Sequence, residues 1–249
     1  MASYYDENGY LNMERIVNLD RVFNFVIGAR GTGKTYGALK YLLKNQIYFM
    51  YLRRTLTQVQ IITTPEMSPF KDINSDLEMN VGFSPIAKNT YGIYEMEGDE
   101  KGGQHPSGAP VGVCTALSTF SNLRGFSGRD IEVIVFDEFI PERSERPIKD
   151  EAGAFLNMYE TINRNRELQG KPPVQVLCLA NSNQIAASIM VDLELIRPVE
   201  KMIKRRTSEV FIDERNTAIF LPSDSPISRQ KRETALYKFS SGTRYYDMA

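Results

Sequence analysis

The chain has 249 residues, 42% of them hydrophobic, so it is long enough for one large domain with a sizeable core and a small appendage. Its 30 basic and 31 acidic residues leave a formal net charge of −1, which excludes a global electrostatic attraction to nucleic acid or anionic lipid. Any contact with nucleic acid must therefore come from local basic clusters.

Cysteine and histidine usage argues against a zinc site and against a disulfide framework. Cys114 and Cys178 are the two cysteines, both in apolar runs without metal-ligand spacing, and His105 is the one histidine. Residues 1–9 are polar and acidic, and no apolar run reaches membrane-spanning length. These features predict a soluble, unexported protein in a reducing compartment, without a membrane contact.

The first motif in chain order is a glycine-rich loop between a strand and a helix. Residues 24–35 read NFVIGARGTGKT, which matches the phosphate-loop pattern G-x-x-x-x-G-K-[ST] without a substitution. The apolar run 22–27 predicts the strand before the loop, and residues 36–43 predict the helix after it. Glycines let backbone N–H groups curl around an anion, and the helix N-terminus attracts the same phosphates. This context favours nucleotide binding over a chance glycine turn.

The loop residues have specific expected roles. Lys34 is expected to reach the β- and γ-phosphates of ATP, and the Thr35 hydroxyl is expected to ligate Mg²⁺. The predicted nucleotide-binding residues are Gly28, Ala29, Arg30, Gly31, Thr32, Gly33, Lys34 and Thr35.

A second buried strand is predicted over residues 46–52 (QIYFMYL), and it delivers Arg53 and Arg54 at its carboxyl end. Ligands bind at that end of the strands in an open α/β sheet, so one arginine is expected near nucleotide or DNA. Two solvated arginines would give the same pattern.

A hairpin with a long tip is predicted next. Residues 84–96 and 111–117 have strand patterns, and residues 98–110 (GDEKGGQHPSGAP) between them are rich in glycine, proline and charge. Such a tip, with Lys101 and His105, is a candidate to touch a threaded polymer, although most exposed loops have no such role.

The second strong motif is a β-branched strand that ends in two carboxylates. Residues 131–138 read IEVIVFDE. After a phosphate loop, this strand is expected to hold magnesium through Asp137. Glu138 is expected to orient and deprotonate the water that attacks the γ-phosphate. The adjacent glutamate therefore favours hydrolysis over transfer of phosphate to a small substrate.

Two further elements carry candidate residues. Residues 151–168 have apolar residues at helical spacing, and the polar end of this predicted helix bears Arg164 and Arg166. Residues 174–180 (VQVLCLA) predict a buried strand followed by Asn181. An amide at that position can sense the γ-phosphate or hold the attacking water, whereas the simpler alternative is a turn-forming Asn.

The C-terminal third contains fewer candidate functional residues. Residues 185–195 are expected to be helical with Pro198 as the stop, and residues 209–213 and 217–221 resemble a hairpin. Residues 201–206 (KMIKRR) and the basic tail 223–249 are local basic patches, for which a solvated face is the ordinary explanation. The predicted organisation is an ATPase domain over residues 1–222 and a linker or lid over residues 223–249.

The motif order predicts the fold. Strands ending in GARGTGKT, FDE and LANSN define an α/β P-loop NTPase of the ASCE type, with an added strand and a catalytic glutamate. A mainly parallel central sheet flanked by helices is expected. The phrases NFVIGARGTGKTYG, YLRR, IVFDEFI, INRNRE and LCLANS, in this order over residues 21–222, also resemble the genome-packaging ATPases, or encapsidation proteins, of small φ29-like tailed phages, which are relatives of the terminase large subunit.

The resemblance implies a motor. Members of that family form a homomeric ring, usually pentameric, that docks on the portal vertex of a prohead in the host cytoplasm, with a packaging RNA as a further candidate partner. They hydrolyse ATP with Mg²⁺ and push double-stranded DNA inside. The resemblance assigns Asn181 to the coupling position, Arg164 to the arginine that reaches a neighbouring subunit's nucleotide, and Arg124 to a second basic residue of similar role. It also implies that residues 223–249 begin a nuclease-like or nucleic-acid-binding C-terminal domain.

Two other functions fit a phosphate loop. A nucleotide or small-molecule kinase would transfer phosphate to a second substrate, and ATP turnover without an acceptor would exclude it. An AAA-type regulator such as a helicase loader would act by ATP-gated binding to a partner protein, with little translocation. Stimulation of the ATPase by DNA and prohead would favour the motor over the regulator.

Overall fold

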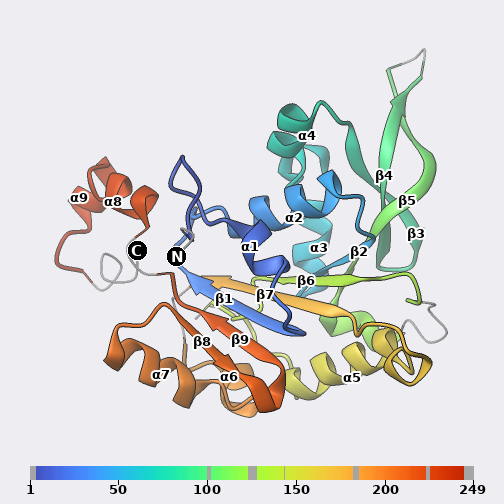
Figure 1. The fold of residues 1–249 in the computed structure, drawn as a ribbon. Coiled ribbons are helices and arrows are strands. Elements are labelled where there is room, and N and C mark those ends of the chain that lie inside the picture. Colours follow the sequence, from blue (N-terminus) through green and yellow to red (C-terminus); the bar gives the residue numbers. More distant parts are fainter. Residues whose placement is uncertain are drawn as a thin grey trace.

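The computed structural model describes residues 4–99, 102–122, 128–142, 144–181, 185–222 and 225–243. Its strands are β1 (Phe23–Gly28), β2 (Phe49–Arg53), β3 (Val81–Ala87), β4 (Thr90–Gly98), β5 (Gln104–Ala116), β6 (Val133–Asp137), β7 (Gln175–Asn181), β8 (Glu209–Ile212) and β9 (Thr217–Phe220). They form one sheet in the order β3-β4-β5-β2-β6-β7-β1-β9-β8 (Figure 1). Neighbours from β5 to β9 in this order are parallel, and β3, β4 and β8 add antiparallel at the two edges.

Helices cover both faces of the sheet (Figure 1). One face carries α1 (Met13–Val17), α2 (Lys34–Lys44), α3 (Leu56–Ile62) and α4 (Lys71–Leu77), and the other carries α5 (Glu151–Asn163), α6 (Ser188–Asp192) and α7 (Ile196–Arg205). Short 3₁₀ turns lie at Pro65–Met67, Leu117–Asn122, Glu167–Gln169 and Asp213–Arg215. The predicted fold class is therefore confirmed.

The parallel strands are apolar because both of their faces are buried. Successive side chains of a strand point to opposite faces. In β1, Phe25 and Ile27 pack in the core under α5, whereas Val26 between them packs in the core under α2. A strand with two buried faces needs a continuous apolar run instead of alternation, and this is why the sequence pattern found these strands. The added strand is β7, which lies between β1 and β6.

The long tip predicted for residues 98–110 is wrong. Strands β4 and β5 stay paired as far as Gly98 and Gln104, so most of this segment is strand. The partners of β2 in β5 begin only at Gly112, so the outer half of β5 has β4 as its ladder neighbour. A strand segment with one free side tolerates Pro106, because proline lacks a backbone N–H and no ladder partner is needed on the free side. Lys101 lies outside the described residues.

Two predicted helix ends also differ. Pro198 does not stop a helix: it lies in the first turn of α7, where a backbone N–H has no intrahelical partner to lose. The helix predicted over residues 151–168 is shorter, because α5 ends at Asn163 and Arg164 takes a left-handed backbone conformation with φ +46°. The helices α3 and α4 were not predicted. The basic residues of 201–206 are exposed at the end of α7.

Strands β8 and β9 pair antiparallel, which confirms the predicted hairpin. The C-terminal segment follows this hairpin. It forms α8 (Pro226–Arg232) and α9 (Ala235–Phe239), which lie beyond the carboxyl-terminal edge of the parallel strands, near the end of β1 (Figure 1). Among the described residues, no helix is long and apolar enough to cross a membrane.

Candidate nucleotide site

The glycine-rich loop joins β1 to α2 with two residues in left-handed conformations. Gly31 has φ +66° and Gly33, the N-cap of α2, has φ +84°. These angles are strained for a residue with a Cβ, which explains glycine at both positions. The buried Thr32 hydroxyl donates to the carbonyl oxygen of Ala29 at 3.0 Å and closes the loop on itself. Backbone N–H groups in a loop of this curled shape can bind an anion.

Lys34 is the first residue of α2 and is 7% exposed. Its Nζ atom donates to the carbonyl oxygens of Gly28 and Ala29 at 3.1 and 2.7 Å, and lies 3.4 Å from Asn181 Oδ1. Burial lowers the pKa of Lys34 to about 8, and the Asp137 carboxylate partly offsets that effect. The ammonium is thus held inside the loop with partners that phosphate oxygens can replace.

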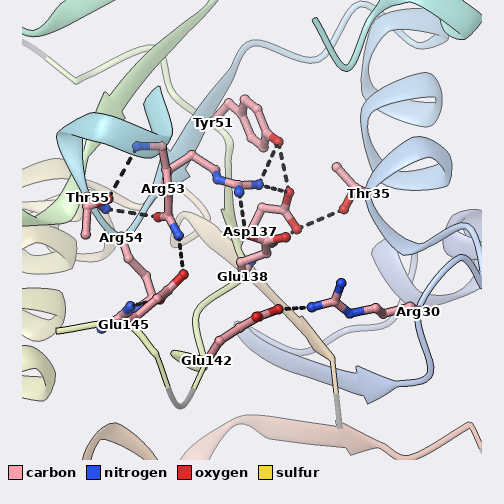
Figure 2. Close-up of polar contacts among 11 residues, drawn as sticks. Arg30, Thr35, Tyr51, Arg53, Arg54, Thr55, Asp137, Glu138, Glu142 and Glu145 are labelled. Atoms are coloured by element: carbon pink, nitrogen blue, oxygen red, sulfur yellow. Dashed lines mark hydrogen bonds and ion pairs between the residues drawn. The ribbon is translucent and has the colours of Figure 1, made fainter. Parts of the chain in front are cut away.

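Asp137 at the end of β6 connects the loop to the neighbouring strands. Its Oδ1 accepts the Thr35 hydroxyl at 2.8 Å, and its Oδ2 accepts the Tyr51 hydroxyl at 2.9 Å and Arg53 Nη1 at 2.7 Å (Figure 2). Burial first, and the Asp137 charge next, raise the pKa of the Tyr51 phenol well above its usual value. Tyr51 therefore stays protonated and donates a hydrogen bond to Asp137.

Glu138 follows Asp137 in a left-handed conformation with φ +52°, which costs about 1–2 kcal/mol in a residue with a side chain. Its backbone N–H donates to Asp137 Oδ1 at 3.1 Å. Its carboxylate is paired with the second terminal nitrogen of Arg53, so one guanidinium spans both acids (Figure 2). The bent backbone and this ion pair together fix where the Glu138 carboxylate lies.

The sheet register explains why residues so far apart in sequence meet. In the paired ladders Gly28 is level with Asn181, and Asp137 is level with Leu179, two residues before Asn181. The carboxyl ends of β1, β7 and β6 therefore reach one edge together. This edge is where ligands bind in open α/β sheets.

Arg54 was not identified from the sequence as a structural residue. It is 0% exposed, and its Nε and Nη2 donate to the two Glu151 carboxylate oxygens at 2.6 and 3.0 Å. Glu145 pairs with the same guanidinium and also accepts Gln58 Nε2 at 3.0 Å. The alternative of two solvated arginines is wrong, since Arg53 is 8% exposed. No local sequence pattern identifies the partners of these two arginines, because the partners lie on elements far along the chain.

Arg30 of the loop forms an ion pair with Glu142, in the segment that follows β6 (Figure 2). A cavity of about 340 Å³ lies between the loop and the ends of β6 and β7. Its lining contains the predicted loop residues from Arg30 onward, both acids and the amide: Arg30, Gly31, Thr32, Gly33, Lys34, Thr35, Tyr36, Asp137, Glu138, Ala180 and Asn181.

Arg164 lies elsewhere. It caps the end of α5, where its Nε donates to the Thr161 carbonyl oxygen at 3.1 Å. The preceding residue, Asn163, accepts the backbone N–H of Val174, just before β7 begins. Arg164 is therefore at the amino-terminal edge of the sheet, roughly 20 Å from the loop of its own chain by the length of β7. Arg124 lies outside the described residues.

Arg166 has a different role from Arg164. Its guanidinium donates to three backbone carbonyl oxygens, those of Pro172 at 3.0 Å, Arg129 at 3.1 Å and Ile131 at 2.8 Å. It therefore holds together the segments that precede β6 and β7. The hollow beside it has a volume of about 280 Å³ and is lined by Arg129, Ile162, Asn163, Arg164, Asn165, Arg166, Gln169 and Lys171.

The fold and the site together define a class of protein. The phosphate loop follows β1, Asp137 and Glu138 lie at the end of β6, and β7 lies between these two strands. This is the arrangement of a P-loop NTPase of the ASCE type. The family model described as Podovirus DNA encapsidation protein (Gp16) matches residues 5–82 and 106–249, and the chain belongs to this family. The unmatched residues 83–105 hold most of β3 and all of β4.

Individual relatives agree with the family. The chain is 26% identical to the DNA packaging protein of Bacillus phage phi29 over 249 residues, which cover 98% of this chain and 65% of the relative. It is 28% identical to the DNA packaging protein of Bacillus phage B103 over 240 residues, which cover 94% of this chain and 64% of the relative. The chain thus spans less than two thirds of the length of these relatives.

One solved structure is similar over nearly its whole length. The N-terminal domain of the DNA packaging ATPase from bacteriophage phi29 matches with a TM-score of 0.63 and 25% identity, covering 87% of this chain and 97% of that domain. Two packaging-motor structures, of Phi-28 gp11 and of the Phi-29 assembly, share the fold at TM-scores of 0.64 and 0.62, with 20% and 23% identity. They cover 96% of this chain each, and 70% and 66% of those chains.

Proposed function

We propose that this chain hydrolyses ATP to translocate double-stranded viral DNA into a prohead. One observation carries the proposal: the phosphate loop with Lys34, and the acids Asp137 and Glu138, line one cavity in a member of a DNA encapsidation family. In this proposal residues 1–222 form the ATPase domain, and residues 223–249 form a basic linker or lid.

The donor set fits magnesium. The Thr35 hydroxyl and the Asp137 carboxylate lie 2.8 Å apart, and both are oxygen donors of the kind that Mg²⁺ prefers. When bound with ATP, Mg²⁺ neutralises charge that develops on the transferred phosphoryl group. Thr35 and Asp137 are therefore the proposed metal ligands.

The remaining side chains act on ATP and on water. Lys34 and the loop N–H groups bind the β- and γ-phosphates, and Asn181, next to Lys34, contacts the γ-phosphate or the attacking water. Glu138 orients that water and accepts its proton, while Arg53 holds the Glu138 carboxylate in position. Water is the acceptor in this geometry, which favours hydrolysis over a kinase reaction.

Arg164 completes the site of a neighbouring subunit. Its place at the opposite edge of the sheet suits a residue supplied in trans, since it lies too far from its own phosphate loop to reach ATP there. A homomeric ring, pentameric by family resemblance, provides such a neighbour. Arg124 remains a second candidate for the trans role.

The proposed partners are double-stranded DNA, the portal vertex of the prohead and a packaging RNA. The proposed location is the host cytoplasm and, transiently, the prohead.

The function is tested by packaging. Portal-bearing proheads, double-stranded DNA and this chain should protect DNA from nuclease when ATP is added, and the ATPase should be stimulated by DNA and prohead together. DNA binding should be independent of sequence and should weaken steeply with salt, because lysine and arginine contacts to phosphates release counterions. Binding that prefers one base sequence at fixed salt would indicate a regulator instead of a translocating motor.

A further inference from the structure

The C-terminal helix α8 touches the phosphate loop. Lys231 Nζ donates to the carbonyl oxygen of Arg30 at 2.6 Å. A Cβ placed on Gly31 would lie 2.0 Å from this ammonium, and Gly31 also needs its positive φ. Glycine at this position therefore leaves the space that the lysine occupies. No family motif in the sequence pointed to this contact, because it joins residues two hundred positions apart.

Other contacts hold the C-terminal segment near the loop independently of Lys231. A Cβ on Gly28 would lie 3.0 Å from Pro222, at the end of the strand that precedes the loop. A Cβ on Gly9, which has φ +83°, would lie 2.8 Å from Pro226, the first residue of α8. Pro222 and Pro226 are thus packed closely against Gly28 and Gly9. The position of α8 is set by these contacts as well as by the lysine.

Three cations gather at this loop. Arg30 is paired with Glu142, and Lys34 is attracted by Asp137, whereas the contact of Lys231 is with a neutral carbonyl. Burial lowers the pKa of Lys231, and the charges of Lys231 and Arg30 add to the burial that lowers the pKa of Lys34. Like charges this close repel one another, and the loop N–H groups add to the positive field. A polyphosphate bound at the loop would be attracted by all three cations and would offset their mutual repulsion.

We propose that Lys231 is a further phosphate-binding residue, whose ammonium leaves the Arg30 carbonyl oxygen for the phosphate oxygens of ATP and holds α8 against the nucleotide. The flexible four-carbon stem of lysine carries three donors, so a shift between neighbouring acceptors needs no movement of the helix axis. The inference rests on the nucleotide binding proposed above and deepens it.

The first experiment measures the Kd of MgATP and MgADP by calorimetry for five chains: the wild type, Lys34→Ala, Lys231→Met, Lys231→Arg and Arg232→Met. Lys231→Met should weaken MgATP binding about tenfold and MgADP binding less, because it removes one charge-assisted hydrogen bond to phosphate. Lys231→Arg keeps the charge and should retain most of the affinity. Arg232→Met changes an exposed neighbour on α8 and serves as the matched control, with wild-type affinity expected. Wild-type affinity for MgATP in Lys231→Met would overturn the assignment.

The outcome separates this inference from the proposed function. If the wild-type chain does not bind MgATP, or if Lys34→Ala binds it normally, the proposed nucleotide site is wrong. If the wild type binds, Lys34→Ala does not, and Lys231→Met matches the wild type, only the role of Lys231 is wrong.

A second measurement uses the unmutated chain and does not depend on how a variant folds. Acetylation of lysines by a small anhydride is followed by mass spectrometry with and without saturating MgATP. MgATP should slow the modification of Lys231, because its ammonium then contacts phosphate. Lys201, exposed on α7, should be modified at the same rate in both samples. Equal modification of Lys231 in both samples would refute the contact.

Discussion

The two edges of the sheet both carry arginines, but the partners of these arginines differ. At the carboxyl-terminal edge, Arg53 pairs with Asp137 and Glu138, and buried Arg54 pairs with acids that follow β6. At the amino-terminal edge, Arg166 donates to backbone carbonyl oxygens, and Arg164 lines a hollow whose described lining contains basic side chains and no carboxylate.

The difference teaches what each edge can do. An arginine between carboxylates is neutralised and serves to position them, as Arg53 does for Glu138. Arg166 instead is held by backbone carbonyl oxygens, which carry no net charge. The first edge therefore has the groups that we propose bind and hydrolyse ATP, and the second has Arg164, which we propose acts on the nucleotide of a neighbouring chain. Four changes test this contrast, and they are taken here in order of expected size.

Arg164→Ala should produce the largest effect. An arginine that stabilises the transferred phosphoryl group contributes about 10³- to 10⁵-fold to turnover. The loss should appear in the steady-state ATPase of assembled rings, with MgATP affinity and thermal stability unchanged. Arg166→Ala is the contrasting variant, because loss of its three carbonyl contacts should lower stability before it lowers catalysis.

Mixing then separates trans from cis action. Chains with Arg164→Ala and chains with Glu138→Ala should each be nearly inactive alone. In mixed rings, verified by sedimentation with nucleotide, some sites combine an intact Glu138 with an intact Arg164 of the neighbour, so part of the activity should return. Verified mixed rings that stay inactive would show that Arg164 acts within its own chain or only structurally.

Glu138→Gln should follow in size, with turnover reduced about 10²- to 10⁴-fold, because the amide keeps the shape of the side chain but cannot accept the proton of water. MgATP binding should persist in this variant, whereas Lys34→Ala should lose it. Single-turnover hydrolysis and calorimetric binding measure the two properties separately. Turnover at the wild-type rate in Glu138→Gln would remove Glu138 from the catalytic assignment.

Arg54→Met tests the buried pairing on the carboxyl-terminal edge. It leaves Glu151 buried without its cation and should lower the free energy of unfolding by about 3–5 kcal/mol. Lys40→Met breaks the exposed pair with Asp76 and should cost less than about 1 kcal/mol. Urea denaturation of both variants gives the comparison. Equal losses would mean that burial does not distinguish the two ion pairs.

The smallest expected effect is on pH dependence. Because the pKa of Lys34 is about 8, the chain without nucleotide loses this positive charge as the pH rises from 7 to 9. Bound phosphates favour the protonated form, so the Kd for MgATP should rise about tenfold over that interval. Lys34→Arg stays charged over the whole range and should give a flat profile. A flat profile for the wild type would place the pKa of Lys34 outside this interval.

Much of the site was determined by the sequence because its groups are local motifs at strand ends. The pattern around Gly28 and Lys34 specifies a loop whose conformation depends on its own glycines, and the apolar strands before Gly28, Asp137 and Asn181 can be buried only in a central sheet. Parallel strands place their carboxyl ends at one edge, so these motifs met as predicted without any knowledge of side-chain contacts.

Only the tertiary structure decided which charges are paired. The sequence contains Arg53 next to Arg54 and does not say that one spans Asp137 and Glu138 while the other is sealed against Glu151, since these partners come from elements far along the chain. Local pattern also misplaced the strand around Pro106, because a free ladder edge is a property of the assembled sheet. The contact of Lys231 with the phosphate loop has the same origin. Local chemistry is written in short motifs, whereas pairing and burial depend on which distant elements the fold brings together.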